Sequence, residues 1–129
     1  MLNDPLADAL SIIKNAEMRG IEKCMIRPSS TLIGGVLHLL KEKGYLGNFE
    51  YVEDGKAGMY QVELHGNIND CGVIKPRFSI KLREMDKWEA RYLPARDFGL
   101  LILTTTEGII SHDEAQKKGI GGKLLAYVY

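Results

Sequence analysis

The stretch LLILTTTEGIISHDEAQKKGIGGKLLAYVY, residues 100–129, decides how the second half of the chain folds. Its apolar start followed by three threonines is typical of a buried strand whose far end emerges into solvent. Short strands are predicted at residues 108–110 and 124–129. The residues SHDE match a capping box, so a brief helix is expected from residue 111 to Gly119. We therefore expect a mostly antiparallel β domain with one short helix.

Two segments before this stretch have weaker patterns. Residues 73–82, VIKPRFSIKL, are strand-like, and Pro76 within them indicates an edge position or a bulge. Four apolar residues of that segment are candidates to face inward: Val73, Phe78, Ile80 and Leu82. Residues 84–93 form either a short helix or an irregular crossover.

The first half of the chain has the punctuation of two helices and a hairpin. Asp4 can cap a helix that starts at Pro5 and stops at Gly20. A second helix is expected from Ser29 or Ser30 to about Lys43, with Gly44 as its stop. A short strand at residues 23–28 precedes it, and alternating residues predict a hairpin from the segments 45–52 and 59–66.

The expected order of elements divides the chain into two small domains. Polar and turn-forming residues cluster at 66–72, so we expect an α-β-α-β-β domain over residues 1–68 and a β-rich domain over 69–129. The predicted fold class is α+β, with both helices of the first domain on one face of a small sheet.

Composition excludes several classes of protein. No apolar run approaches the roughly 20 residues of a transmembrane span, so a soluble intracellular protein is expected. Cys24 and Cys71 have no nearby Cys or His at metal-ligand spacing, which favours free, buried or half-buried thiols. His38 and His65 have no plausible carboxylate or Cys partner in the sequence, and both are expected to be surface or partly packed imidazoles. No cofactor and no metal are expected.

Net charge is zero, which argues against binding polyanions by bulk charge alone. The charge is unevenly distributed, however. Residues 1–64 carry 7 Lys and Arg against 9 Asp and Glu, whereas residues 65–129 carry 10 against 8. Residues 75–83, KPRFSIKLR, hold four basic residues and no acid. The second half is therefore the better candidate for contact with an anionic partner.

Two motifs have the residue types of catalytic or phosphate-binding sites but unsuitable geometry. Ser111, His112 and Asp113 are adjacent at a helix start, where their side chains fan out and cannot converge as a triad. The glycines at 119–122 precede a strand and lack the Lys-Ser/Thr of a P-loop. We expect no enzyme and no small-molecule substrate, and interpret these glycines as a helix stop and a tight turn.

Two other groups leave alternatives open. Trp88, Tyr92 and Phe98 sit among basic residues, so their rings either stack on bases or fill the interface between the two halves. The threonine triplet, residues 104–106, either completes a strand or forms a neutral hydroxyl patch that can satisfy base edges and 2′-hydroxyls.

Motifs along the whole chain resemble a single family. They are DPLADAL and IKNA, then GYLGNFE and DGKAG, then KPRF and YLPARDFG, and finally TTTEGIISHDEAQKKGIGGKLLAYVY. Together they resemble the eighth protein of the small ribosomal subunit in its archaeal and eukaryotic-type form. The terminal motif, a hydroxyl triplet followed by Glu-Ala, Gly-Gly and an aromatic-rich last strand, is highly specific to that family.

The resemblance implies a primary rRNA-binding protein of two small domains. It would dock on a helix in the central domain of small-subunit (16S-type) rRNA, help to assemble the platform, and contact neighbouring small-subunit ribosomal proteins in the cytoplasm. The implied RNA contacts lie in the triplet, the Gly-Gly turn and the two N-terminal helices: Thr104, Thr105, Thr106, Gly121, Gly122, Lys123, Asn3, Lys14, Asn15, Ser29 and Ser30. Lys75 and Arg77 of the basic stretch complete the set.

Recognition by neutral hydrogen bonds predicts a modest fall of affinity with salt. It also predicts that Thr105→Val weakens RNA binding by about 1 kcal/mol with folding largely kept. The alternative function is a protein-interaction module within a ribonucleoprotein, formed around residues 88–98.

Overall fold

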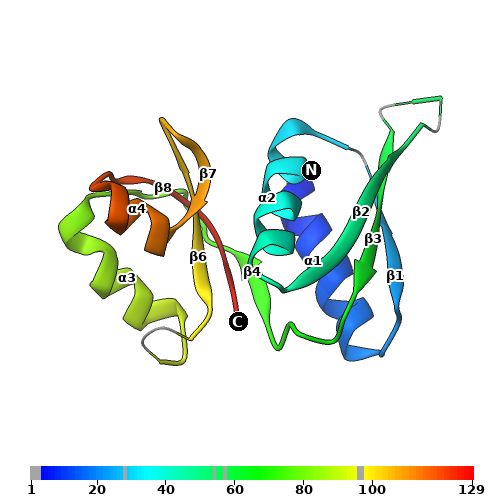
Figure 1. Ribbon diagram of the computed structural model, residues 1–129, viewed down its shortest axis with the longest axis horizontal. Helices are drawn as coiled ribbons and strands as arrows, with labels where there is room; N and C mark the ends of the chain where they lie inside the picture. Colours follow the sequence, from blue (N-terminus) through cyan, green and yellow to red (C-terminus); the bar gives the residue numbers. More distant parts are fainter. Residues whose placement is uncertain (1–3, 28, 54, 57, 96–97) are drawn as a thin grey trace. The chain divides into compact units, whose positions relative to one another are not determined.

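The computed structural model describes residues 4–27, 29–53, 55–56, 58–95 and 98–129 (Figure 1). Two compact units make up the chain, Met1–Asn69 and Asp70–Tyr129. The boundary expected from the sequence falls one residue earlier. Both units combine helices with antiparallel sheet, so the predicted α+β class is confirmed. No helix in the described ranges is long and apolar enough to cross a membrane.

The first unit contains two helices and a three-stranded sheet in the predicted order. In sequence these are α1 Pro5–Met18, β1 Lys23–Ile26, α2 Thr31–Glu42, β2 Leu46–Val52 and β3 Met59–Leu64. The sheet has the strand order β1-β3-β2, and both strand pairs are antiparallel.

Local capping chemistry sets the helix ends of this unit. The Asp4 carboxylate accepts hydrogen bonds from the backbone N–H groups of Leu6 and Ala7, and the Ser30 hydroxyl accepts one from Ile33 at 3.1 Å. Gly20 and Gly44 follow the two helices with φ of 70° and 82°, a left-handed conformation that favours glycine. Because the Ser30 side chain accepts the hydrogen bond from Ile33, Ser30 rather than Ser29 is the cap of α2.

One face of this sheet and one stripe of each helix form the core of the first unit. Helix α1 contacts β1 and β3, and α2 contacts β2. The buried side chains follow the helical spacing and the alternation expected from the sequence: Leu6, Leu10, Ile13, Ile33, Val36, Leu37, Leu40, Ile26, Val62 and Leu64.

The second unit is built on a five-stranded antiparallel sheet. Its elements are β4 Cys71–Val73, β5 Ser79–Ile80, the 3-10 turn η1 Leu82–Glu84, α3 Met85–Tyr92, β6 Leu100–Thr105, β7 Gly108–Ser111, α4 His112–Lys118 and β8 Gly122–Val128. Strands run in the order β4-β8-β6-β7, and β5 also pairs with β8. Residues 84–93 thus resolve into a helix rather than an irregular crossover.

The predicted strand at residues 73–82 is partly wrong. It consists of two short strands, β4 and β5, because the chain leaves the sheet around Pro76. Leu82 was expected to face inward, but it begins η1 and is 41% exposed. Ile74, which was not expected in the core, is buried, and its N–H donates to the carbonyl of Leu125.

The core of the second unit contains Trp88. Trp88 is 6% exposed and packs with buried side chains of β6 and β8 in one cluster, with Phe78 and Tyr92 against it. Its ring centroid lies 4.8 Å from that of Phe78 and 6.1 Å from that of Tyr92. The Trp88 ring is therefore used in packing and is not available to stack on bases, whereas Phe98 is 49% exposed.

The cysteines are as expected, and one histidine is not. Cys71 is a buried free thiol, and Cys24 is a half-buried one whose pKa is raised to about 11 by burial and by the nearby Glu17 carboxylate. The expectation that His38 has no carboxylate partner is wrong, because its Nε2 lies 3.4 Å from Glu42 Oε1 one helical turn away.

Candidate functional site

An open groove of about 400 Å³ lies where β5, β6 and β8 of the second unit meet. Eight residues of these strands and the turns beside them line it: Ser79, Ile80, Thr104, Thr105, Thr106, Gly121, Gly122 and Lys123. Six of the residues proposed from the sequence are thus brought together. The groove also includes Ser79, which was not among them.

Strand register aligns three polar side chains across this groove. Thr104 of β6 pairs with Lys123 of β8, and Lys123 pairs with Ser79 of β5. Residues paired directly across antiparallel strands project to the same face of a sheet. Two hydroxyls therefore flank one ammonium group, and Lys123 is the only charged side chain among the described residues that line the groove.

The hydroxyl of Thr105 is used inside the protein. It donates to the carbonyl of Gly108 at 2.9 Å and accepts from the N–H of Glu107 at 3.0 Å, so it closes the turn between β6 and β7. Thr106 follows in that turn and is exposed, while Thr104 is half-buried. The three threonines of the triplet are therefore not equivalent.

Gly121 and Gly122 do not form the tight turn expected from the sequence. Gly122 is the first residue of β8, and of the three glycines at 119–122 Gly119 alone has a positive φ, as the cap of α4. A Cβ on Gly121 would clash with the carbonyl oxygen of Ile80. A Cβ on Gly122 would lie 2.6 Å from both the Thr104 carbonyl oxygen and Thr105 Cγ2. These glycines allow β8 to pass between β5 and β6.

Helix α4 and a buried polar pair pack behind the hairpin formed by β6 and β7. The Ser111 hydroxyl caps α4 by accepting from the N–H of Glu114 at 3.3 Å, as predicted. The next residue, His112, is 2% exposed; its Nδ1 accepts from the N–H of Leu101 at 3.1 Å. Its Nε2 lies 3.3 Å from Oε2 of Glu89, which is also buried.

The tautomer of His112 follows from these contacts. Because Nδ1 accepts, the neutral ring carries its proton on Nε2 and donates it to Glu89. The pair joins α3 to the start of α4 and to β6. Sequence reasoning missed it, because Glu89 and His112 are 23 positions apart and only the fold brings them together. Ser111 faces the helix N–H groups, so the structure agrees that these residues do not form a triad.

The remaining predicted site residues lie outside the groove. Lys75 and Arg77 are exposed in the segment between β4 and β5 of the second unit. In the first unit, half-buried Lys14 and exposed Asn15 are on α1, and half-buried Ser29 and Ser30 precede α2. The Ser29 N–H donates to the carbonyl of Gly58. Asn3 lies outside the described residues.

The chain matches known proteins over its full length. A family model described as ribosomal protein S8 matches residues 4–129. A curated relative, the small ribosomal subunit protein uS8 of Methanococcoides burtonii, is 59% identical over 129 residues, which are 100% of this chain and 99% of that protein.

Proposed function

The chain belongs to the ribosomal protein S8 family, and we propose that it binds the central domain of small-subunit rRNA through the groove between β5, β6 and β8. It is a structural protein of the small ribosomal subunit, and rRNA binding is the role of its family. Three finer points are proposed: that the bound RNA element lies in the central domain, that the chain helps to assemble the platform of the subunit, and that the groove residues contact the RNA. The cytoplasm, where small subunits work, is the proposed location.

The polar row Thr104–Lys123–Ser79 is the observation that supports this site. A hydroxyl both donates and accepts, so Thr104 and Ser79 suit base edges and 2′-hydroxyls, whereas Lys123 suits a phosphate. Phosphate contacts fix position and base contacts give specificity, and the row offers both kinds. A groove rather than a convex ridge also suits an RNA segment whose bases are splayed out of a helix.

Each groove residue then has its own role. Thr104, Thr106 and Ser79 supply hydroxyls to the RNA, and Lys123 supplies the positive charge. Thr105 contributes indirectly, since its hydroxyl shapes the turn that presents Thr106. Gly121 and Gly122 keep the strands close enough for the row to form. Ser79 therefore joins the set proposed from the sequence.

The residues outside the groove are proposed as secondary contacts to the sugar-phosphate backbone. Lys75 and Arg77 are exposed cations of the same unit as the groove. Lys14, Asn15, Ser29 and Ser30 of the first unit would add contacts of the same kind, as would Asn3. Such contacts position the protein but do not select the sequence.

Footprinting tests the proposal directly. Small-subunit rRNA is probed with hydroxyl radicals in the presence and absence of the purified full-length chain. We expect protection confined to one helical element of the central domain and lost with Lys123→Ala. Ser79→Ala should weaken binding without moving the footprint. Protection elsewhere in the rRNA, or equal affinity for an unrelated RNA hairpin, would contradict the proposed site.

A further inference from the structure

The three-stranded sheet of the first unit has an outward face that the proposed rRNA contacts do not use. Strand register gives its composition: Lys23 pairs with Glu63, and both Met25 and Glu50 pair with Gln61. These side chains alternate with the buried ones that contact α1 and α2. We call this the outer sheet face, and its principal residues are Ile21, Lys23, Met25, Glu50 and Glu63, with Glu22 at its edge, in the bend before β1.

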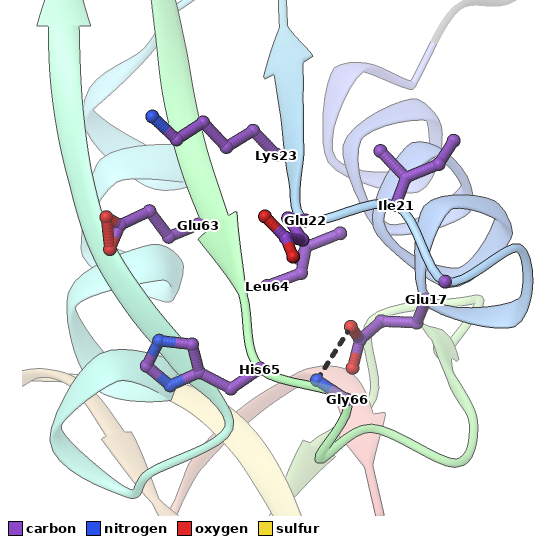
Figure 2. A pocket seen from close by; sticks show the side chains of 9 residues that line it. Glu17, Ile21, Glu22, Lys23, Glu63, Leu64, His65 and Gly66 are labelled. Atoms are coloured by element: carbon purple, nitrogen blue, oxygen red, sulfur yellow. Dashed lines mark hydrogen bonds between the residues drawn. The ribbon is translucent and has the colours of Figure 1, made fainter.

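Two adjoining hollows shape this face. The larger, about 520 Å³, lies at the turn from α1 into β1 and at the end of β3 (Figure 2). A smaller one of about 80 Å³ continues across the strands, and both are lined by Lys23 and Glu63. Figure 2 shows these two side chains projecting to the same side of neighbouring strands. The two hollows therefore adjoin at Lys23 and Glu63, and we call them together the track.

Glu17 shapes this track but is used structurally. Its carboxylate accepts a hydrogen bond from the N–H of Gly66 at 3.1 Å (Figure 2). It also accepts one from the N–H of Ile68 at 2.9 Å. It therefore holds the segment after β3 against the end of α1. Because the Glu17 carboxylate already accepts these two hydrogen bonds, it is less available to a partner. The negative charge that a partner would recognise must therefore come from Glu22, Glu50 and Glu63.

Those acids have no close ion-pair partner in the described part of the chain, although Lys23 is the cross-strand neighbour of Glu63. Glu22, Glu50 and Glu63 form no ion pair with any residue that the structure describes, and Lys23 is the one cation that lines the two hollows in those ranges. The negative carboxylates repel the negative phosphates of RNA, so this face is unsuited to rRNA. Its charge complements a cationic partner instead.

Apolar side chains are exposed beside these acids. Ile21 is 42% exposed and Met25 is 41% exposed, and Met18, the last residue of α1, is 73% exposed. Lysine and arginine carry long apolar stems below their charged heads. Such stems can cover Ile21 and Met25 while the heads reach Glu22 and Glu63. A partner with only apolar residues, or only charges, would match half of this surface.

We propose that the outer sheet face binds an extended, lysine- and arginine-rich segment of a neighbouring protein of the small subunit. This inference rests on the proposed function, because assembly on rRNA brings the chain beside other proteins that neutralise phosphate with basic residues. The track over the strands fits an extended chain, and the unpaired carboxylates supply its specificity.

Photo-crosslinking in assembled small subunits tests this surface. The full-length chain carries a photoreactive amino acid in place of Met25, and the cross-linked partner is identified by mass spectrometry. We expect one Lys- and Arg-rich protein segment. Glu22→Lys combined with Glu63→Lys should lower the cross-link yield about tenfold, because repulsion replaces attraction. Glu63→Gln, which keeps the size of the side chain, should lower it less and in the same direction.

Glu42→Lys is the matched control, since Glu42 is an exposed acid of the same unit on α2, outside the face; its yield should stay within about twofold. Cross-links to rRNA or to an acidic or neutral segment, no cross-link, or a yield insensitive to both Glu63 changes would overturn the proposal. Affinity of the isolated variants for rRNA is measured in parallel. If Lys123→Ala binds rRNA as tightly as the unchanged chain while the charge-dependent cross-link is seen in assembled subunits, only the groove is refuted. If Lys123→Ala binds rRNA more weakly but the Met25 position gives no cross-link in assembled subunits, only the outer sheet face is refuted.

Discussion

The three threonines of the triplet differ in what their hydroxyl groups already bond. Thr105 closes the β6–β7 turn, Thr104 stands beside Lys123, and Thr106 is exposed in the turn. The sequence predicts a hydroxyl patch at residues 104–106 but cannot separate three identical neighbours. Their difference comes from strand register, which depends on which strands pair with β6.

Thr104→Val should weaken rRNA binding about five- to tenfold, because a methyl group of the same shape replaces one of the hydroxyls proposed to contact the RNA. Valine suits a strand, so folding should be unchanged. Filter binding to a central-domain rRNA fragment measures the affinity. Thr105→Val is the matched control. It should cost about 0.5–1 kcal/mol of stability through the turn and affect rRNA binding less than Thr104→Val.

This order of effects revises the expectation that Thr105 itself contacts the RNA. A larger loss of affinity in Thr105→Val than in Thr104→Val, with stability unchanged, would restore the original expectation.

His112→Phe should destabilise the second unit by about 2–4 kcal/mol. The change removes the acceptor of the buried Leu101 N–H and leaves the Glu89 carboxylate without its histidine partner, and each buried loss of this kind costs about 1–3 kcal/mol. Trp88, the single tryptophan, is buried in this unit, so its fluorescence in a urea titration reports the unfolding. Glu89→Gln keeps an oxygen that accepts from His112 Nε2 and should cost much less. Equal losses of stability in His112→Phe and Glu89→Gln would show that the charge of Glu89, and not its hydrogen bond with His112, stabilises the second unit.

Among the elements, those with local signals are the ones that the sequence predicts. Helices α1 and α2 begin at the predicted caps, and the β2–β3 hairpin follows its alternating residues. Leu82 was assigned wrongly because its apolar character continues the strand pattern, while Glu84 accepts from the Lys81 N–H at 2.8 Å and starts a turn there. The glycines at 121–122 were assigned to a turn because nothing local distinguishes a turn glycine from one required by a neighbouring strand.

Gly122→Ala should therefore lower the stability of the second unit by about 1–3 kcal/mol. Its Cβ would meet the Thr104 carbonyl oxygen and Thr105 Cγ2 at 2.6 Å, so β6 and β8 must move apart. The separation also disturbs the Thr104–Lys123–Ser79 row, so rRNA affinity should fall with stability. Urea titration and filter binding on the same samples measure both effects.

Gly119→Ala controls for the loss of a glycine. A Cβ there meets no atom within 4 Å, and only the left-handed conformation, φ 70°, is penalised, by about 1 kcal/mol. It should leave rRNA affinity unchanged at temperatures where the protein is folded. If Gly122→Ala binds rRNA as well as Gly119→Ala does, the close approach of the strands is not needed for recognition.

For the whole molecule, zero net charge hides an uneven distribution of charge between the two halves of the sequence. The first half of the sequence has an excess of acids and the second half an excess of bases. The groove of the second unit contains one lysine, while the glutamates of the outer sheet face of the first unit form no ion pair with a described residue. Sequence alone shows the asymmetry. It cannot show the groove itself, whose polar row joins residues 79, 104 and 123 from three strands.

The salt dependence of rRNA binding follows from this small number of cations. If only Lys14, Lys75, Arg77 and Lys123 meet phosphates, the slope of log affinity against log salt should be no steeper than about −4. Lys123→Gln should make the slope shallower by about one, because one phosphate contact is lost. Filter binding across a series of salt concentrations gives both values. Lys118→Gln, at an exposed position on α4 outside the groove lining, is the control and should leave the slope unchanged. A slope near −10, or an equal change in the two variants, would mean that bulk charge, and not hydrogen bonding in a shaped groove, holds the RNA.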